Sequence, residues 1–312
     1  MLRQSSDLLQ TLQAAESNLT ILEERVQVEF DLAFTFHQGD ESKLLVDLEA
    51  QETYLRALEL FDELDRQWPG RSEPPVLGQR MLAKVALHHG DRAEALRLWR
   101  EGLTLGTTYL DQQPGSLNVC IEVGWTCVHL CDALSSESPE PAAEIGTVLT
   151  QGVEAVGKSL ANQPHSTRAA DVTASLQIRM AALKCRQGRV DEALPMFEQA
   201  VSGMEALCEG SPWTADYWNS LRWFHQEIVV NLRGAERDAA AGHALDQFQK
   251  WLDRVSPQMA DESDLREQVQ VSQGWLNNLL VSNYGEAQSV NETESKGQKE
   301  PLIEDNNSTS EK

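Results

Sequence analysis

The chain is short of basic residues. Among its 312 residues, 26 Lys and Arg stand against 49 Asp and Glu, which gives a net charge of −23. Proteins bind nucleic acids through Lys and Arg side chains that displace counterions from phosphates, so we expect no nucleic-acid partner. An anionic membrane surface is disfavoured for the same electrostatic reason.

Long apolar runs and targeting signals are also missing. No run reaches the 18 or more apolar residues that a membrane span needs. The opening, MLRQSSDLLQTLQAAESN, has no basic start followed by an apolar block, so it does not resemble a secretory signal. The five cysteines are odd in number and scattered, which is typical of reduced thiols. We therefore expect a cytoplasmic protein without a membrane partner.

The chain lacks the common catalytic motifs. It has no G-x-S-x-G, no H-E-x-x-H and no Cys-x-x-Cys, and it lacks the glycine-rich ATP loop, H-R-D and D-F-G of protein kinases. We predict no catalytic residues, no cofactor and no metal, and we do not expect a small-molecule ligand.

What the chain does contain is a repeat. The stretch LHHGDRAEALRLWREG (87–102) returns as CRQGRVDEALPMFEQA (185–200), 98 residues later. In each copy a glycine is followed by alanine five residues on and by an aromatic residue nine residues on. Five prolines recur at separations of 45, 50, 48 and 45, which indicates helical repeats with a period near 49. The matching residues are Gly90, Ala95, Trp99, then Gly188, Ala193, Phe197 and Ala200, and the prolines are Pro69, Pro114, Pro164, Pro212 and Pro257.

Each repeat position has a physical reason. Glycine suits the left-handed residue that ends a helix, and acidic residues suit the start of the next helix. Alanine lets two helices approach closely, and the aromatic side chain one turn later fills the space beside that contact. Each unit is therefore expected to be a pair of antiparallel helices of about 20 residues each. In the third unit Gly152 takes the aromatic position, which we expect to loosen that hairpin.

This pattern resembles the tetratricopeptide repeat. Ala83 and Ala181 lie seven residues before the two glycines, where that family has the small residue of its first helix. The period here exceeds the family's usual length of about 34 residues. Long, degenerate repeats of this kind are also similar to those that follow the catalytic domain of some bacterial serine/threonine kinases. The resemblance implies an all-α solenoid of about five antiparallel helical hairpins, with a long N-terminal helix and a C-terminal capping helix.

The sequence divides into three segments: an N-terminal helix and linker (1–44), a helical repeat domain (45–283) and a disordered acidic tail (284–312), whose composition is too polar to form a core. The N-terminal segment carries apolar residues at heptad spacing. It either packs on the repeats or mediates dimerisation. The seam residues are Leu8, Leu12, Ala15, Leu19, Leu22 and Val26.

Two short motifs invite a chemical interpretation. GVEAVGKS (152–159) matches the spelling of a phosphate-binding loop, with Lys158 and Ser159 in the ligand positions, but no strand-helix alternation surrounds it. We expect it to lie within a repeat helix. In CVHLC (127–131) the cysteines share a helix stripe with Cys120, whereas His129 points away from it, so core packing is favoured over a metal or redox site.

For a partner we can name only candidates on the first helices of the repeats. Arg80 and Lys84 lie one turn apart and could meet an acidic peptide or a C-terminal carboxylate, and Arg179 could extend that stripe. Trp218 and Trp223 are either part of a wide buried face or anchors for a peptide. The predicted partner-binding residues are Arg80, Lys84, Arg179, Trp218 and Arg222.

A solenoid of this type typically offers a concave surface lined by the first helix of each hairpin. We therefore expect a non-catalytic scaffold or adaptor for a peptide or protein partner. The alternatives are a regulatory repeat module of a serine/threonine kinase system, and an enzyme that uses the Lys158 loop.

Overall fold

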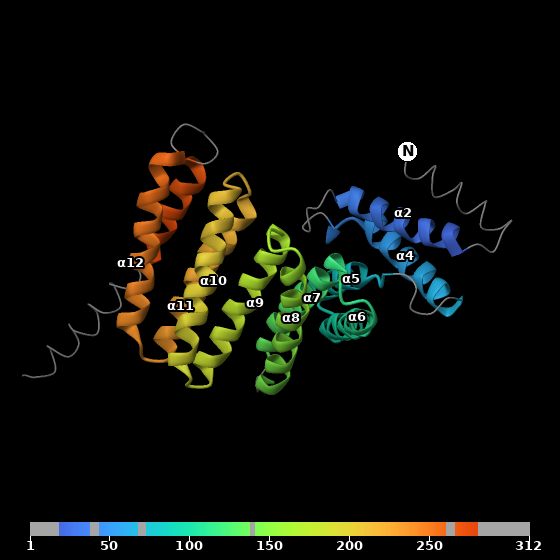
Figure 1. Cartoon of the computed structure of the whole chain (residues 1–312), viewed down its shortest axis with the longest axis horizontal. Coiled ribbons are helices and arrows are strands. Elements are labelled where there is room, and N and C mark those ends of the chain that lie inside the picture. The colour runs from blue at the N-terminus through green and yellow to red at the C-terminus, as the bar shows by residue number, and fades with distance from the viewer. Residues whose placement is uncertain (1–18, 38–43, 68–72, 138–140, 260–265, 280–312) are drawn as a thin grey trace, which may run out of the picture. The chain divides into compact units, whose positions relative to one another are not determined.

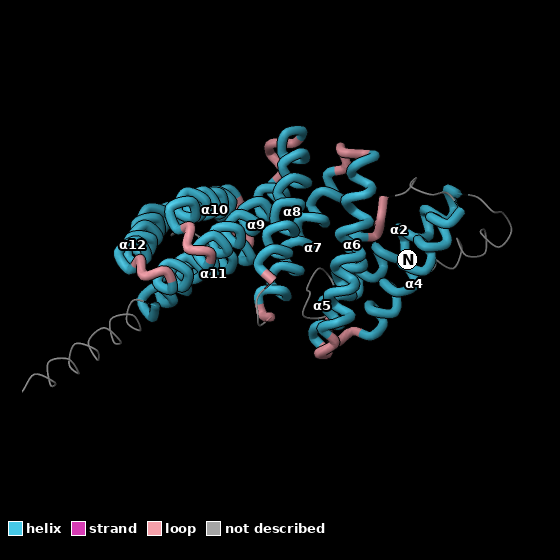
Figure 2. The backbone as a smooth tube through the Cα atoms, turned by 90° about the horizontal axis from the view of Figure 1, so that it is seen from below, coloured by secondary structure: helices cyan, strands magenta, loops and turns pink. Residues whose placement is uncertain are grey.

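The computed structural model describes residues 19–37, 44–67, 73–137, 141–259 and 266–279. These residues form helices and short turns without any strand (Figure 1, Figure 2). The chain divides into two compact units, Met1–Ala241 and Gly242–Lys312. The predicted acidic tail (284–312) and the first half of the N-terminal heptad seam lie outside the described residues.

The first unit is an all-α solenoid of helical hairpins, as predicted. Helices that follow one another in the chain pair with each other, and most helices are 19 to 21 residues long. The pairs are α2 (Leu19–His37) with α4 (Leu48–Gln67), α5 (Val76–His88) with α6 (Arg92–Gln112), α7 (Leu117–Ser135) with α8 (Ala142–Asn162), and α9 (Thr167–Arg186) with α10 (Val190–Gly210), after which comes α11 (Ala215–Gly234).

The hairpins stack so that their helices fall into two layers. Helices α5, α7, α9 and α11 contact one another in that order, and we call them the A layer. Helices α4, α6, α8 and α10 form the B layer, and each packs against the A-layer helix that follows it in the chain. Figure 2 shows this succession along the unit.

The predicted glycine turns are confirmed. Gly90 and Gly188 have φ angles of 82° and 75°, in the left-handed region. In the first turn the Asp91 amide donates to the Ala86 carbonyl at 2.9 Å, which is the six-residue bond of a Schellman cap. The same turn recurs after α11, where the left-handed residue is Glu236 with φ 58°.

The repeat positions form the core between the helices. The alanines and aromatic residues that define the repeat are at most 2% exposed. The expectation that Gly152 loosens the third hairpin is wrong. A Cβ there would lie 2.9 Å from Leu176 Cδ2 and 3.0 Å from Cys127 Cβ, so the missing side chain lets α8 pack directly on α7 and α9. The buried repeat residues are Ala83, Ala95, Trp99, Ala181, Ala193, Phe197 and Ala200.

Helix α7 is the most apolar helix to consider for a membrane span. Among the described residues it is the one helix, over Leu117–Ser135, that is long and apolar enough to cross a membrane by length and composition. However, 72% of that segment is buried within the protein, where α7 contacts α5, α6, α8 and α9. Packing in the core accounts for its apolar composition.

Helix α2 packs on α4 as the first helix of a hairpin. Leu22 and Val26, the last residues of the heptad seam, pack against Phe61 and Leu64 of α4. The described part of the N-terminal segment therefore packs within its own hairpin.

The second unit contains most of α12 (Asp238–Val255), the short helix η1 (Ser256–Met259) and a helix over 266–279. An aromatic cluster joins its two long helices. The Phe248 ring centroid lies 6.0 Å from those of both Trp251 and Trp275, with the latter edge-on.

Candidate partner-binding face

The two layers of the first unit differ in charge. The A-layer helices carry eight Lys and Arg against five Asp and Glu, a net charge of +3. The B-layer helices carry six against sixteen, a net charge of −10. The layers carry similar numbers of basic residues, but most acidic residues lie on the B layer, so the A layer has the net positive charge. The A layer is therefore the candidate partner-binding face.

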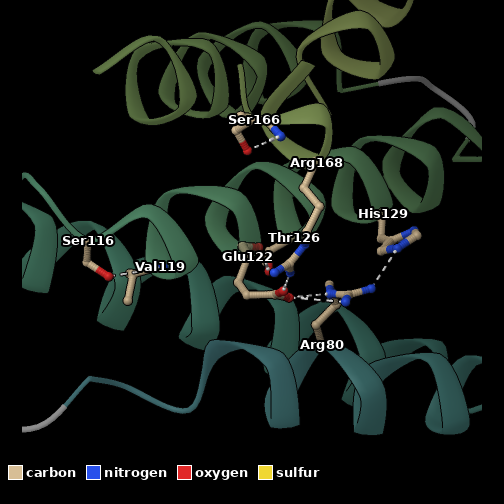
Figure 3. A network of polar contacts seen from close by, with 9 residues as sticks. Arg80, Ser116, Val119, Glu122, Thr126, His129, Ser166 and Arg168 are labelled. Carbon is tan, nitrogen blue, oxygen red and sulfur yellow. Dashed lines mark hydrogen bonds and ion pairs between the residues drawn. The ribbon is translucent and has the colours of Figure 1, made fainter. Parts of the chain in front are cut away.

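Arg80 lies at the centre of a polar network between α5 and α7. Its Nε donates to Glu122 Oε2 at 3.1 Å, and its Nη1 lies 3.4 Å from His129 Nε2 (Figure 3). The other Glu122 oxygen accepts from Arg168 Nη2 of α9 at 3.1 Å. The side chains of Arg80 and Glu122 are only 8% and 11% exposed. Arg80 is therefore a buried link between helices, and not the solvent-facing residue that the sequence suggested.

His129 marks the point where three basic side chains converge. The pKa of His129 is held well below its usual range, first by burial and then by the charges of Lys84, Arg80 and Arg179. Its ring stacks near that of Trp125, with the centroids 6.1 Å apart. Neutral imidazole is thus the stable form, so the positive charge of the cluster comes from its Lys and Arg side chains alone.

Arg179 joins three A-layer helices. Its guanidinium makes two 2.7 Å hydrogen bonds with the Asp132 carboxylate of α7 and donates to the Ser175 carbonyl at 2.8 Å. It also lies 4.5 Å from the ring centroid of Trp223 on α11, a cation–π geometry. Asp132, Arg179 and Trp223 line a pocket of about 410 Å³ together with Glu227, whose pKa is raised by burial.

The remaining two predicted residues lie apart from this cluster. Trp218 is fully buried and its Nε1 donates to the Pro212 carbonyl at 2.8 Å, so it cannot serve as a surface anchor. Arg222 is half-buried; burial lowers its pKa, and the nearby Cys208 of α10 raises it. The structure therefore brings Arg80, Lys84 and Arg179 together and places the other two elsewhere.

Several important residues were not identified from the sequence. Glu122, Asp132, Trp125, His129 and Arg168 each contact a predicted residue or one of its partners. A signal was present, because polar contacts between adjacent hairpins recur at one repeat distance. The separations are 42 for Arg80–Glu122, 43 for Glu73–Ser116, 44 for Arg100–Glu144, 46 for Glu122–Arg168 and 47 for Asp132–Arg179.

The two chemical motifs lie in helices. GVEAVGKS falls within α8, as predicted, with Ser159 buried and Lys158 exposed, so its backbone does not wrap around a phosphate. Cys120, Cys127 and Cys131 are buried in α7, and burial raises the pKa of each thiol. Over the described ranges, no three His, Cys, Asp or Glu side chains come close enough to hold a metal ion.

Comparison with known proteins supports the fold. No protein-family model and no curated protein sequence matches the chain. Among solved structures, the crystal structure of BtubC (BKLC) from P. vanneervenii is similar, with a TM-score of 0.50 and 16% sequence identity. The match covers 81% of this chain and 89% of that chain. At this identity the likeness concerns the fold alone, that of a helical repeat protein.

Proposed function

We propose that this helical repeat protein is a cytoplasmic, non-catalytic scaffold or adaptor whose A layer binds an acidic segment of a protein partner. The observation that supports this proposal is the difference in net charge between the layers, +3 on the A-layer helices against −10 on the B-layer helices. Complementary potentials steer association and select partners, so an acidic segment is favoured at the A layer and repelled elsewhere.

The residues of the A layer divide into two roles under this proposal. Arg80 and Arg179 hold neighbouring hairpins together through ion pairs with Glu122 and Asp132, and the side chains of both arginines are mostly buried. Lys84, Trp125 and Trp223 are partly exposed and can contact a partner directly. Tryptophan is enriched among residues that dominate binding energies, which favours these two positions as anchors.

We further propose that the repeats are of the tetratricopeptide type. The buried alanines and the aromatic residues of the two clearest hairpins occupy the positions that this repeat uses for close helix packing. The similarity to repeat regions of some bacterial serine/threonine kinases keeps such a kinase as the alternative: a partner that this chain would regulate.

The test is capture of partners by the immobilised full-length chain from an extract of its source cells, followed by mass spectrometry. The informative variant is Lys84→Glu on α5, and the matched control is Lys158→Glu on the B-layer helix α8, which changes the net charge equally. We expect one protein to be captured reproducibly by wild type and control, and at least fivefold less by Lys84→Glu.

Raised salt should weaken the same capture, because exposed charges are screened over about 10 Å at 0.1 M salt. Recovery of a serine/threonine kinase would favour the regulatory alternative. Capture of no reproducible protein, or equal loss with both variants, would refute the proposed A-layer function.

A further inference from the structure

A second surface lies at the other side of the first hairpins. Helices α4, α5 and α6 enclose a groove of about 440 Å³, in which α5 contacts both of the other helices. Leu82 and Val85 of α5 and Leu98 of α6 line it and are 7% to 8% exposed. Leu55 of α4 also lines the groove and is 51% exposed. The groove is therefore open and presents an exposed apolar side chain.

The lining residues follow a helical spacing on all three helices. On α4 they are Gln51, Leu55, Leu58 and Asp62, at i, i+4, i+7 and i+11. The same spacing recurs from Pro75 to Ala86 along α5 and from Glu94 to Leu105 along α6. Eleven residues of helix span about 16 Å, so each of the three helices contributes a stripe about three turns long. This geometry matches an amphipathic helix, which presents its own anchors at the same intervals.

The polar residues of the groove indicate the charge of such a helix. Three carboxylates line it, from Asp62, Glu94 and Glu101, against the single guanidinium of Arg97. Arg97 is held between Glu94 and Glu101 by hydrogen bonds of 2.7 to 2.8 Å. The groove thus keeps an excess of negative charge, which lies within an acidic chain of net charge −23. A second copy of this chain would be repelled, whereas flanking Lys and Arg would be attracted.

The groove also contains a buried polar group. Gln79 is 5% exposed, and its Oε1 has no hydrogen-bond partner among the described residues. A buried amide oxygen without a donor is costly, so a donor brought into the groove would be favoured there.

Repeat geometry alone does not produce the acidic lining of this groove. A comparable groove of about 520 Å³ lies between α8 and α9, two hairpins further on. It is also apolar in part, with Met180 and Leu183 in its lining, but its charged groups are the basic Lys184 and Arg189. The acidic groups are therefore particular to the first groove.

We propose that the α4–α5–α6 groove is a docking site for an amphipathic helix of a protein partner, whose leucine-like apolar stripe is flanked by basic residues. The site uses α5 residues other than Arg80 and Lys84, and its charge preference is opposite to that of the A layer. A chain with both sites can join an acidic segment and a basic amphipathic helix.

Fluorescence anisotropy of two labelled probe peptides tests this proposal on the full-length chain. One probe is a helical leucine–lysine peptide with all leucines on one face, and the other replaces every lysine with glutamate. We expect the lysine peptide to bind and the glutamate peptide to bind at least tenfold more weakly. Equal binding of both peptides, or no binding of the lysine peptide, would overturn the proposal.

Paired variants locate the binding. Leu55→Ser should weaken it about fivefold through lost apolar contact, whereas Val230→Ser, at an exposed valine of α11, should leave it within twofold. Asp62→Lys should weaken it more than Glu154→Lys, an equal change of charge on α8. Lys84→Glu should leave the binding within twofold, because Lys84 is not among the residues that line the groove. The proposed docking site would be contradicted if the two variants of a pair weakened peptide binding equally. It would also be contradicted if the chain formed a dimer that Leu55→Ser dissociates.

Discussion

Asp171, near the start of α9, is a carboxyl group that the fold keeps from water. Its Oδ1 has no hydrogen-bond partner among the described residues. Burial raises its pKa to about 7, and the charge of Asp216 on α11 contributes to the same shift. Cys208 of α10 and Tyr217 of α11 also interact electrostatically with it. We predict that Asp171→Asn stabilises the protein at neutral and alkaline pH.

The sign follows from proton binding. In the unfolded chain Asp171 loses its proton near its ordinary pKa of 3.8, but in the folded protein it keeps the proton until about pH 7. Between these values the folded state binds one more proton than the unfolded state, so the stability of the wild type falls as the pH rises. Each pH unit in this range costs about 1.4 kcal/mol, and the whole shift costs up to about 4 kcal/mol. Asparagine, which does not titrate, removes this dependence.

Urea unfolding followed by circular dichroism at pH 5.5 and pH 8.5 measures the effect. The stability gained by Asp171→Asn should be about 2 kcal/mol larger at pH 8.5 than at pH 5.5, because the folded wild type is still protonated at the lower pH. Asp216→Asn removes the second cause of the shift and should make the wild-type pH dependence smaller. If Asp171→Asn changes the stability equally at both pH values, the carboxyl group is not protonated in the fold and the reasoning fails.

Three further predictions concern helix contacts and turns, each measured by denaturant or thermal unfolding. Gly152→Ala should destabilise the protein by about 1–2 kcal/mol because its Cβ would meet Cys127. Gly157→Ala in the same helix, with no atom near its Cβ, should stabilise the protein by about 1 kcal/mol. Stability changes of the same sign in both variants would contradict the close packing of α8. Glu236→Gly should stabilise by about 0.5–1 kcal/mol by relieving its positive φ, and a loss of stability would argue against the left-handed turn. Glu122→Gln should destabilise the protein by about 3 kcal/mol, because it removes the charge of the buried Arg80–Glu122 pair. Glu144→Gln, in the exposed Arg100–Glu144 pair, should destabilise it by under about 1 kcal/mol. A larger effect of Glu144→Gln would show that the buried pair is not formed.

Local and periodic features of the fold could be predicted from the sequence. The turn at Gly90 requires a left-handed residue, and the pattern of Gly90, Ala95 and Trp99 returns two hairpins later. The helix boundaries and the core residues could therefore be inferred directly. These features depend on residues within one hairpin. They are therefore visible in a short stretch of chain.

The candidate site depends on contacts between side chains of different hairpins. The sequence alone does not say which of these side chains face each other. Arg80 looks like a surface residue on its own helix, but Glu122 lies 42 residues away and turns it into a buried link. Trp218 is at the edge of its helix stripe, but in the fold it is fully buried and its Nε1 donates to the Pro212 carbonyl. Side-chain direction at such positions is decided by the neighbouring helices.

The carboxylate of Glu122 has a consequence for how the array can change in length. It accepts from Arg80 of one hairpin and from Arg168 of the hairpin two places on. Deletion of the hairpin α7–α8 would join α6 to α9. The guanidinium groups of Arg80 and Arg168 would then lie on adjacent hairpins without the Glu122 carboxylate between them. Loss of that hairpin by recombination would thus be penalised, and new units are more readily accepted at positions outside this triplet.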